Sequence, residues 1–306
     1  MENKKEKNKI TIVTHSGQFH ADDIFAVATL ALMLEEKHEI KVVRSRDPEI
    51  INGADYVVDV GGIYDEEKKR FDHHQLEGGG VRENGIPYAS FGLVWKKYGP
   101  ELAGDSEASS KIEQKLVIPI DAYDSGITLG SSLFPDINYY TIDDLVAAFR
   151  VTWKENEKEL DTRFEFLMNI AKQLLVREIK KLKDKKEAEK FILEAYAQNN
   201  NKTLLNLDKY YPYKTCMDSM PDILLVTYPD AVGENWCLEA ANVPNKKFVS
   251  KILLPESWAG KRDQELETVT GVPGAVFCHK DRFFAVAKTQ EGIIKLAELA
   301  LEEAGK

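Results

Sequence analysis

Hydrophobic positions in the first third of the chain follow two alternating patterns. Short β-branched runs predict buried strands, and stretches rich in Ala and Leu with apolar residues at helical spacing predict helices. Strands are expected at 10–14, 40–43 and 56–60, and helices at 24–34, 88–98 and 111–120. Gly61-Gly62 is expected to end the third strand, and Gly99-Pro100 the second helix. Strands interleaved with helices indicate an α/β fold with a mostly parallel sheet and flanking helices.

The pattern changes after residue 164. Apolar residues recur at helical spacing from Phe164 to about Gln198, which predicts one long amphipathic helix. Asn199-Asn200-Asn201 is expected to end this helix. Beyond it, strand-like runs at 223–228, 236–240, 275–278 and 283–286 precede a last helix at 292–304. The sequence therefore predicts two domains, 1–200 and a smaller α+β domain at 201–306, with the active site in the cleft between them.

Composition narrows the class of protein. The chain has 306 residues, 43% of them hydrophobic and 30% charged, which is ordinary for a soluble globular protein. Its net charge of -10 opposes broad, non-specific nucleic-acid binding, which relies on Lys and Arg, although a local basic groove is compatible with it. No apolar run approaches the roughly 20 residues that span a bilayer, and the first nine residues are unlike a secretory signal.

Cysteine usage indicates a reducing compartment. Cys216, Cys237 and Cys278 are widely spaced, odd in number and form no CxxC motif. They are expected to be buried thiols without a chemical role, which suits a reducing environment. We expect a cytoplasmic protein with no membrane partner.

The first cluster of candidate ligands lies between the first strand and the first helix. It holds His15, His20, Asp22 and Asp23 within nine residues. In an open parallel sheet, ligands bind outside the carboxyl ends of the strands, where this segment is expected to lie. Asp22 or Asp23 could instead cap the following helix. Two histidines together with two aspartates favour metal binding.

Two further segments follow strands. Asp59 is the only acid in an apolar strand, where a carboxylate is costly unless it is paired or binds a metal, although Asp is also common in turns. In Asp72-His73-His74, one imidazole could bind a metal while the other faces substrate. The adjacent carboxylate could accept the distal N–H and hold the tautomer of the ligating ring.

Other candidates are less sharply defined. Asp121 and Asp124 follow a predicted helix, and either could complete a dinuclear site, or both could form a helix stop and turn. In the second domain, four residues are candidates for substrate binding, and each could equally be an ordinary surface residue. They are Arg262, His279, Lys280 and Lys288.

The ordered segments HSGQFHADD, VVDVGG, FDHH, PYASFGLVWKKYG and PIDAYDSG resemble the DHH phosphoesterase superfamily. Within it, the chain is similar to the family of the melanocyte proliferating gene protein, which is associated with 3′-to-5′ RNA exonuclease activity and is also labelled a metal-dependent protein hydrolase. RSRD at 44–47, LPESWAGKRDQEL at 254–266 and GVPGAVFCHKDRFFAVAKTQEG at 271–292 extend the resemblance over nearly the whole chain.

The resemblance implies two divalent cations, usually manganese, bridged by Asp59. The implied ligands are His15, His20, Asp22, His73 and either Asp121 or Asp124. Many members carry Asp where this chain has His20, so the number and identity of the ions stay open, with Mg, Zn, Co or Fe as alternatives to Mn.

The resemblance also carries roles for substrate-facing residues. His74, beside Asp72, is expected to contact a phosphate oxygen or to transfer a proton to the leaving group. Arg44 and Arg46 are expected to bind substrate.

The sequence thus predicts a divalent-metal-dependent phosphodiester hydrolase acting on RNA or short oligonucleotides. One rival is a phosphatase or pyrophosphatase that uses the same ions on a small molecule. Another is a non-catalytic regulatory protein on the same scaffold. A homo-oligomer is compatible with each of them.

Overall fold

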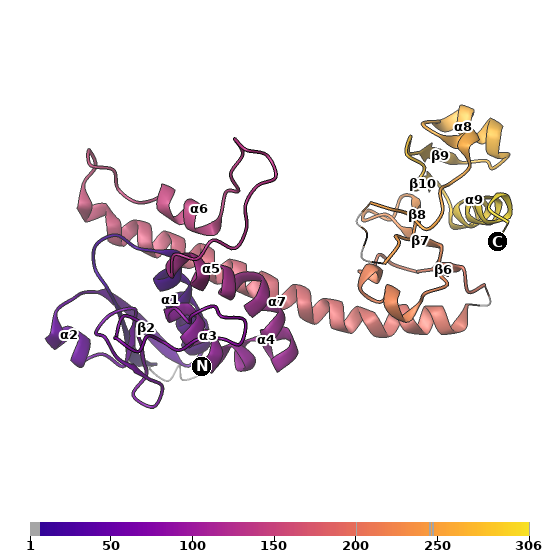
Figure 1. Ribbon diagram of the computed structural model, residues 1–306. Helices are drawn as coiled ribbons and strands as arrows, with labels where there is room; N and C mark the ends of the chain where they lie inside the picture. The colour runs from indigo at the N-terminus through magenta and orange to yellow at the C-terminus, as the bar shows by residue number, and fades with distance from the viewer. Residues whose placement is uncertain (1–6, 200, 245, 247, 306) are drawn as a thin grey trace, which may run out of the picture. The chain divides into compact units, whose positions relative to one another are not determined.

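The computed structural model describes residues 7–199, 201–244, 246 and 248–305 (Figure 1). The chain forms two compact units, Met1–Leu182 and Lys183–Lys306. The division falls within the long helix α7 (Leu160–Gln198), whereas the sequence prediction places the domain boundary after that helix. Each unit contains its own five-stranded sheet, so the protein is a mixed α/β structure.

The sheet of the first unit is mostly parallel. Its strand order is β2-β1-β3-β5-β4. The strands are β1 (Asn8–Thr14), β2 (His38–Arg44), β3 (Tyr56–Val58), β4 (Tyr64–Asp65) and β5 (Arg70–Phe71). Only β4 runs antiparallel to its neighbour, β5. The short β-branched runs predicted β1 to β3. The two-residue strands β4 and β5 are too short to form such a run.

Helices of the first unit build a core beside this sheet. They are α1 (Ala21–Leu34), α2 (Pro48–Asn52), α3 (Ser90–Ala103), α4 (Ser106–Ile112), a π-helical turn (Glu113–Val117), α5 (Ile118–Asp124) and α6 (Ile142–Ala148). The Phe25 ring of α1 packs against Phe91 of α3, with ring centroids 5.4 Å apart. Phe91 and Trp95 are fully buried.

Helix α3 corrects one prediction, because it does not end at Gly99-Pro100. It continues to Ala103 and ends at Gly104, whose φ of 93° is the left-handed conformation that glycine adopts readily. Pro100 removes one helical N–H, but Lys96 and Pro100 are exposed, so water can reach the carbonyl left without a partner. Gly99 serves close packing, since a β-carbon there would lie 2.7 Å from the Trp95 ring.

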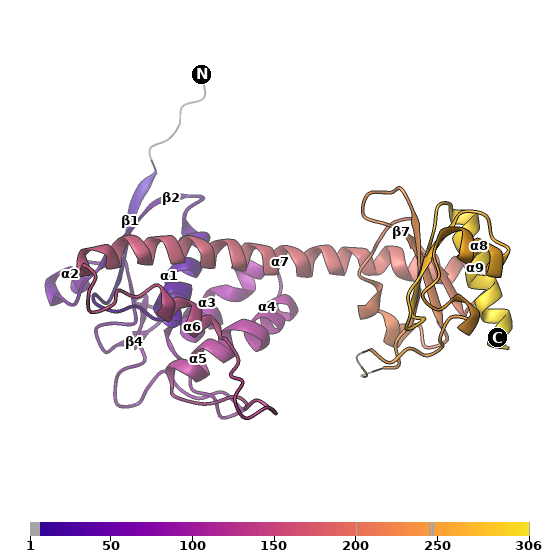
Figure 2. The same cartoon turned by 90° about the horizontal axis from the view of Figure 1, so that it is seen from above.

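Helix α7 contributes to the cores of both units. Phe164, Leu167 and Leu175 are buried in the first unit's core, where the first half of the helix packs (Figure 2). Ala188 and Ile192 are buried in a core cluster of the second unit. Although α7 is long, within the described part of the chain no helix is both long enough and apolar enough to cross a membrane.

The second unit has a sheet of order β6-β7-β8-β10-β9. Its strands are β6 (Leu204–Asn206), β7 (Leu225–Pro229), β8 (Trp236–Ala240), β9 (Ala275–Cys278) and β10 (Phe284–Ala287). Only β6 and β7 pair in parallel; the other neighbours are antiparallel.

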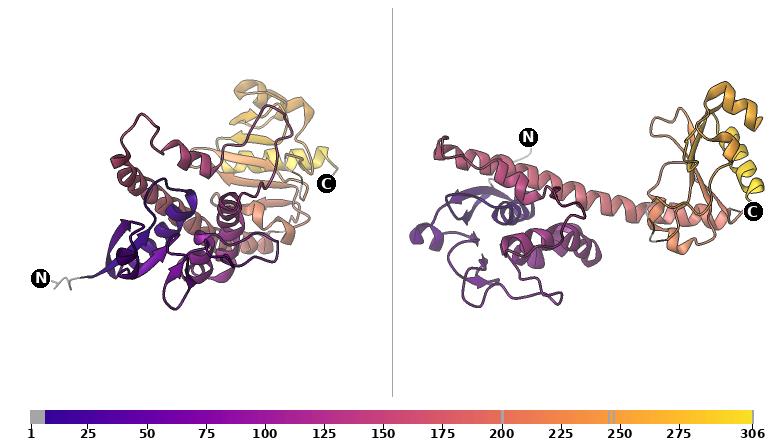
Figure 3. Two further views of the ribbon diagram at one scale, coloured as in Figure 1. Left: turned by 60° about the vertical axis from the view of Figure 1, so that its left-hand side comes forward. Right: turned by 45° about the horizontal axis from the view of Figure 1, so that its top comes forward.

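Two helices complete the second unit. Helix α8 (Asp263–Thr270) packs against β9, and α9 (Gln290–Glu303), the yellow helix of Figure 3, packs against β7, β8 and β10. The second unit thus combines a mostly antiparallel sheet with α8 and α9. All three cysteines are free and buried, as predicted.

Candidate metal centre

The carboxyl ends of β1, β3 and β5 bring the histidine and aspartate segments together. His15 directly follows β1, Asp59 follows β3, and Asp72-His73-His74 follows β5. These strands are parallel, so their ends lie at one edge of the sheet. Strand β3 stops at Val58, earlier than predicted, because Asp59 has a φ of 54°, a conformation that Asp tolerates better than most residues.

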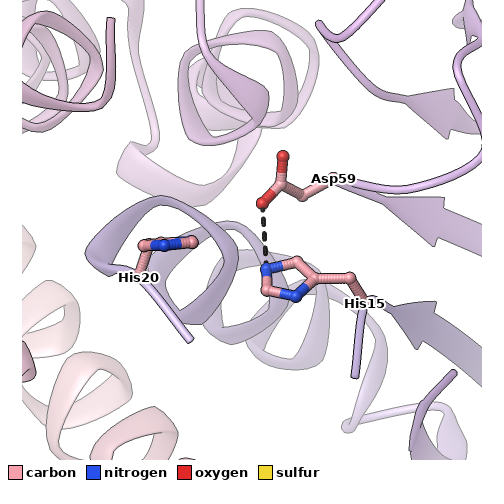
Figure 4. A group of neighbouring side chains, drawn as sticks. All are labelled: His15, His20 and Asp59. Carbon is pink, nitrogen blue, oxygen red and sulfur yellow. Dashed lines mark ion pairs between the residues drawn. The ribbon is translucent and has the colours of Figure 1, made fainter. Parts of the chain in front are cut away.

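Asp59 lies between the buried imidazole of His15 and the partly buried imidazole of His73. Its Oδ2 is 3.4 Å from His15 Nε2 (Figure 4), and its Oδ1 is 3.3 Å from His73 Nε2. The angles of these contacts are not those of hydrogen bonds, so neither Nε2 atom has a hydrogen-bond partner. A buried polar atom without a partner is costly, and most such atoms in folded proteins are satisfied. Each of these nitrogens could therefore bind a metal ion next to the Asp59 carboxylate.

His20 and the neighbouring aspartates extend the cluster. One ligand atom each from His15, His20 and Asp59 lie within 4.8 Å of one another. His20 is the residue that precedes α1, and its N–H donates to Asp23 Oδ1 at 2.8 Å. Asp23 Oδ2 is 3.1 Å from His15 Nε2. Asp23 therefore caps α1, as the alternative interpretation allowed, and also faces the cluster.

Asp22 has two structural roles at once. Its oxygens accept hydrogen bonds from the backbone N–H groups of Ser90 (3.0 Å) and Phe91 (2.6 Å), at the beginning of α3. A second set of ligand atoms, from Asp22, His73 and Asp124, also lies within 4.8 Å. Asp22 thus caps α3, a helix distant in sequence, while it borders the His73 side of the cluster.

The structure separates Asp121 from Asp124. Asp124 Oδ2 is 3.2 Å from His73 Nε2. Asp121 is fully buried and pairs with Arg82 Nη2 at 2.7 Å, and it accepts the Gly92 N–H at 3.0 Å. A β-carbon at Gly92 would overlap the Asp121 carboxylate, so glycine makes this pairing possible. Asp124 faces the cluster, whereas the hydrogen bonds of Asp121 are made elsewhere.

Asp72 is bonded to His74 and not to His73. Its Oδ1 is 2.7 Å from His74 Nδ1, and its Oδ2 accepts the Gly62 N–H at 2.6 Å. The hydrogen bond from His74 keeps the pKa of Asp72 low although burial alone would raise it, and the same bond raises the pKa of His74. His74 therefore holds a proton on Nδ1 toward Asp72. Its side chain is mostly exposed, which leaves Nε2 for other partners.

Charge in the cluster favours a cation. Burial alone would lower the pKa of His15, but Asp23 and Asp59 raise it to about 10. His73 shows the same balance, and Asp124 and Asp59 raise its pKa to about 11. Burial raises the pKa of Asp22 well above its usual range, and the nearby acids add to this effect. The carboxylates thus attract positive charge, whether as protons or as metal ions.

These side chains border a cavity of about 440 Å³. It is lined by His15, His20, Arg46, Asp59, His73, His74, Tyr123, Asp124, Asp143 and Arg150. Arg46 and Arg150 are the arginines in its described lining, and each donates a hydrogen bond from a guanidinium nitrogen to a carbonyl of the loop after β1. Burial raises the pKa of Asp143 to about 7. Sequence analysis did not single out Arg150 or Asp143, because neither belongs to a His- or Asp-rich motif.

Arg44 does not line this cavity. Its side chain is only 3% exposed and forms an ion pair with Asp161 at 2.8 Å. It also donates to the Gly17 carbonyl and lies against the rings of Phe19 and Phe164. In this structure, Arg46 faces the centre and Arg44 anchors the loop beside it.

The second-domain candidates gather around β9 and β10 within their own unit. The Arg262 guanidinium lies over the Phe277 ring, 4.5 Å from its centroid. His279 Nδ1 accepts the Asp281 N–H at 3.1 Å, and its ring packs against Phe283. Lys280 follows β9 and Lys288 follows β10. Lys288 lies beside Gly274 at the beginning of β9, whereas His279 and Lys280 follow its end, so the four residues are spread along the β9–β10 pair.

Fold and site together define an α/β protein with a cluster of His and Asp side chains that could hold metal ions. Residues 11–301 match the model of the MYG1 exonuclease family, described as "Uncharacterised protein family (UPF0160)". The chain belongs to this family.

Relatives align over nearly the full chain. The MYG1 protein of Dictyostelium discoideum is 30% identical, over 97% of this chain and 98% of its own. The MYG1 exonuclease of Homo sapiens is 29% identical, over 95% of this chain and 86% of its own. A crystal structure of an exopolyphosphatase-related protein from Bacteroides fragilis aligns over 97% of this chain and 92% of that one, but at 13% identity and a TM-score of 0.24, which carries no argument.

Proposed function

We propose that the protein is a divalent-metal-dependent phosphodiester hydrolase of the DHH type that removes nucleotides from the 3′ end of RNA or short oligonucleotides. The observation that carries this proposal is the position of Asp59, whose two oxygens face the Nε2 atoms of His15 and His73, neither of which has a hydrogen-bond partner. The human relative's name, MYG1 exonuclease, supports the reaction class.

The donor set fits divalent cations. Atoms that each bind one ion at ~2.1 Å lie roughly 3.0–3.4 Å apart in octahedral or tetrahedral geometry. The contacts of Asp59 with His15 and His73, and of Asp124 with His73, measure 3.2–3.4 Å. Mixed imidazole and carboxylate ligands suit manganese, iron, cobalt or zinc better than magnesium, and we propose manganese.

Two groups of side chains would hold the ions. His15, His20 and Asp59 would hold one, and Asp22, His73 and Asp124 the other. Asp59 Oδ1 also lies 3.3 Å from His73 Nε2, so Asp59 borders both groups. When bound, such cations acidify water and offset the charge that builds on a phosphoryl group during in-line displacement.

Other residues of the cavity act on the substrate. Arg46 and Arg150 would bind the phosphate, since they are the arginines in the described lining of the cavity and their guanidinium groups suit phosphate oxygens. His74, with Nδ1 oriented by Asp72, would direct Nε2 at a phosphate oxygen or at the leaving oxygen, to which it could pass a proton. In the second unit, Arg262, His279, Lys280 and Lys288 are proposed to bind the rest of the strand.

A labelled-substrate assay tests this function. The protein, loaded with manganese, is incubated with an oligoribonucleotide labelled at its 5′ end and, separately, at its 3′ end. We expect the 5′-labelled strand to shorten step by step, and the 3′ label to be released at once as a mononucleotide. Pyrophosphate and cyclic dinucleotides serve as competing substrate classes. Turnover of these small compounds alone would contradict the exonuclease assignment.

A further inference from the structure

A second cavity adjoins the candidate metal centre. It has a volume of about 990 Å³, at the upper end of the range for small-molecule sites, and is lined by residues of α5 and of the long segment between α5 and α6. Figure 1 labels α5 and α6 and shows the segment that joins them. Tyr123 and Asp143 line this groove and also line the cavity of the metal centre. The two spaces are therefore neighbours within the first unit.

The groove is apolar and aromatic, although it is open to solvent. Phe134, Tyr139 and Tyr140 line it with 65%, 66% and 73% of their surfaces exposed. A contiguous group of exposed apolar residues commonly marks a binding surface. Among the described residues, Lys115 and Asp143 are the only charged ones in its lining. Lys115 pairs with Glu178 at 2.6 Å.

The chemistry of the groove suits bases better than phosphates. A backbone-binding channel needs lysines and arginines, whereas the one lysine here already has a carboxylate partner. Aromatic faces stack on any nucleobase, and stacking does not depend on sequence. The lining also offers Thr128, Ser131 and Asn138, whose side chains can form hydrogen bonds with base edges.

The position of the groove selects the occupant. A phosphodiester held by Arg46 and Arg150 would lie in the adjoining cavity, and Tyr123, which is 52% exposed, stands where the two spaces share their lining. We propose that the groove binds one or two nucleobases of a single-stranded substrate, next to the phosphodiester at the metal centre. The inference rests on the proposed function and specifies its substrate as unpaired nucleic acid.

The test removes two exposed rings from the groove. In the manganese-loaded protein, Tyr139→Ala with Tyr140→Ala should raise KM for a pentaribonucleotide about tenfold or more and leave kcat nearly unchanged, because each stacked base contributes ~1–3 kcal/mol. Tyr139→Phe with Tyr140→Phe keeps both rings and should leave KM close to that of the unaltered protein. Phe248→Ala, a change at a 96% exposed ring of the second unit, is the matched control.

A substrate without bases separates stacking from other effects. An analogue that keeps one terminal nucleotide but has abasic sugars elsewhere should show the same KM in the Ala pair and in the unaltered protein. Equal KM values for the complete pentaribonucleotide in these two proteins would overturn the proposal. Circular dichroism should show an unchanged fold, since both tyrosines are exposed.

Binding distinguishes this proposal from the proposed function. A pentamer with phosphorothioate linkages, which resists cleavage, is titrated by fluorescence anisotropy. If no substrate is cleaved but the Ala pair weakens binding tenfold, the hydrolase proposal fails and the groove stands. A different result would show that a second copy of the chain covers the groove. In that case the unaltered protein is a dimer, the Ala pair is a monomer, and the two proteins bind the pentamer with equal affinity. The assignment of the groove to nucleobases would then be wrong.

Discussion

Two acidic groups, the buried Asp59 of the first unit and the partly buried Glu239 of the second, have opposite surroundings. Glu239 of β8 accepts hydrogen bonds from the hydroxyls of Tyr213 and Tyr228, both at 2.8 Å, and from Lys214 Nζ at 2.6 Å. Asp59 accepts a hydrogen bond from the Ser90 hydroxyl at 3.2 Å. Its other close polar neighbours include histidine nitrogens that have no hydrogen-bond partner.

The contrast distinguishes a structural cluster from a candidate binding cluster. Around Glu239, the surrounding donors already use the carboxylate, so no additional ligand is needed. Burial and Glu239 together raise the pKa values of Tyr213 and Tyr228, which keeps these hydroxyls protonated as donors. Around Asp59, the donor atoms of His15 and His73 remain available. The presence of an acidic side chain in a core therefore says little about function. What distinguishes the two clusters is whether the neighbouring donor atoms already have hydrogen-bond partners.

The largest expected effect comes from Asp59→Asn. An amide still fills the space but loses the charge shared by both proposed ions, so bound manganese and metal-dependent turnover should both disappear. Elemental analysis of purified protein and the oligonucleotide assay measure these quantities, with circular dichroism for the fold. Glu239→Gln is the control, and its metal content should not change. If Asp59→Asn retained its full manganese content, the Asp59 cluster would be no more a metal site than the Glu239 cluster.

Next in size is the difference between Asp121 and Asp124. Asp121→Asn weakens the charge-assisted bond to Arg82, which keeps Glu113 as a partner at 2.8 Å, and should lower the free energy of unfolding by about 1.5–3 kcal/mol. Asp124→Asn removes a proposed ligand and should weaken manganese binding at least ~10-fold, with little loss of stability. Urea unfolding and metal titration measure the two effects. The reverse result would make Asp121 the ligand.

A smaller effect is expected for Glu239→Gln. The amide keeps one acceptor but loses charge-assisted bonds to Tyr213, Tyr228 and Lys214, so the free energy of unfolding should fall by about 1 kcal/mol. Turnover should stay the same. A large loss of activity in this variant would show that the second cluster is more than structural.

A pH dependence of stability is expected for the metal-free protein. His15 and His73 have pKa values of about 10 and 11 in the fold, against 6.5 ordinarily. Their contribution to stability is complete below about pH 6.5 and is lost as pH rises through the folded values. The urea midpoint of chelated protein should therefore fall from pH 7 to pH 10. With manganese bound, the coordinated histidines carry no such proton, so a parallel fall would count against coordination.

Much of the fold follows from local pattern, and the exceptions have physical causes. Strands β1 to β3 were predictable because each contains a short β-branched apolar run, and helix α1 because its apolar residues recur at helical spacing. The end of α3 was predicted wrongly because solvent exposure makes Pro100 tolerable, and exposure is a property of the folded chain.

The candidate site was predictable where it follows strands. His15, Asp59 and His73 each come after a parallel strand, so topology alone brings them to one edge. Asp121 and Asp124 could not be separated, because Arg82, the partner of Asp121, lies 39 residues earlier. Arg150 and Asp143 reach the cavity through tertiary packing and carry no local signal.

Asp22 makes one side chain responsible for two different parts of the molecule. Both of its oxygens hold the first amides of α3, and the same carboxylate borders the His73 side of the cluster. A substitution of Asp22 would remove hydrogen bonds from the first turn of a core helix and would also alter the surroundings of the proposed ions. The position of the first turn of α3 and the positions of the ligand atoms are thus coupled through one carboxylate, so a displacement of either one displaces the other.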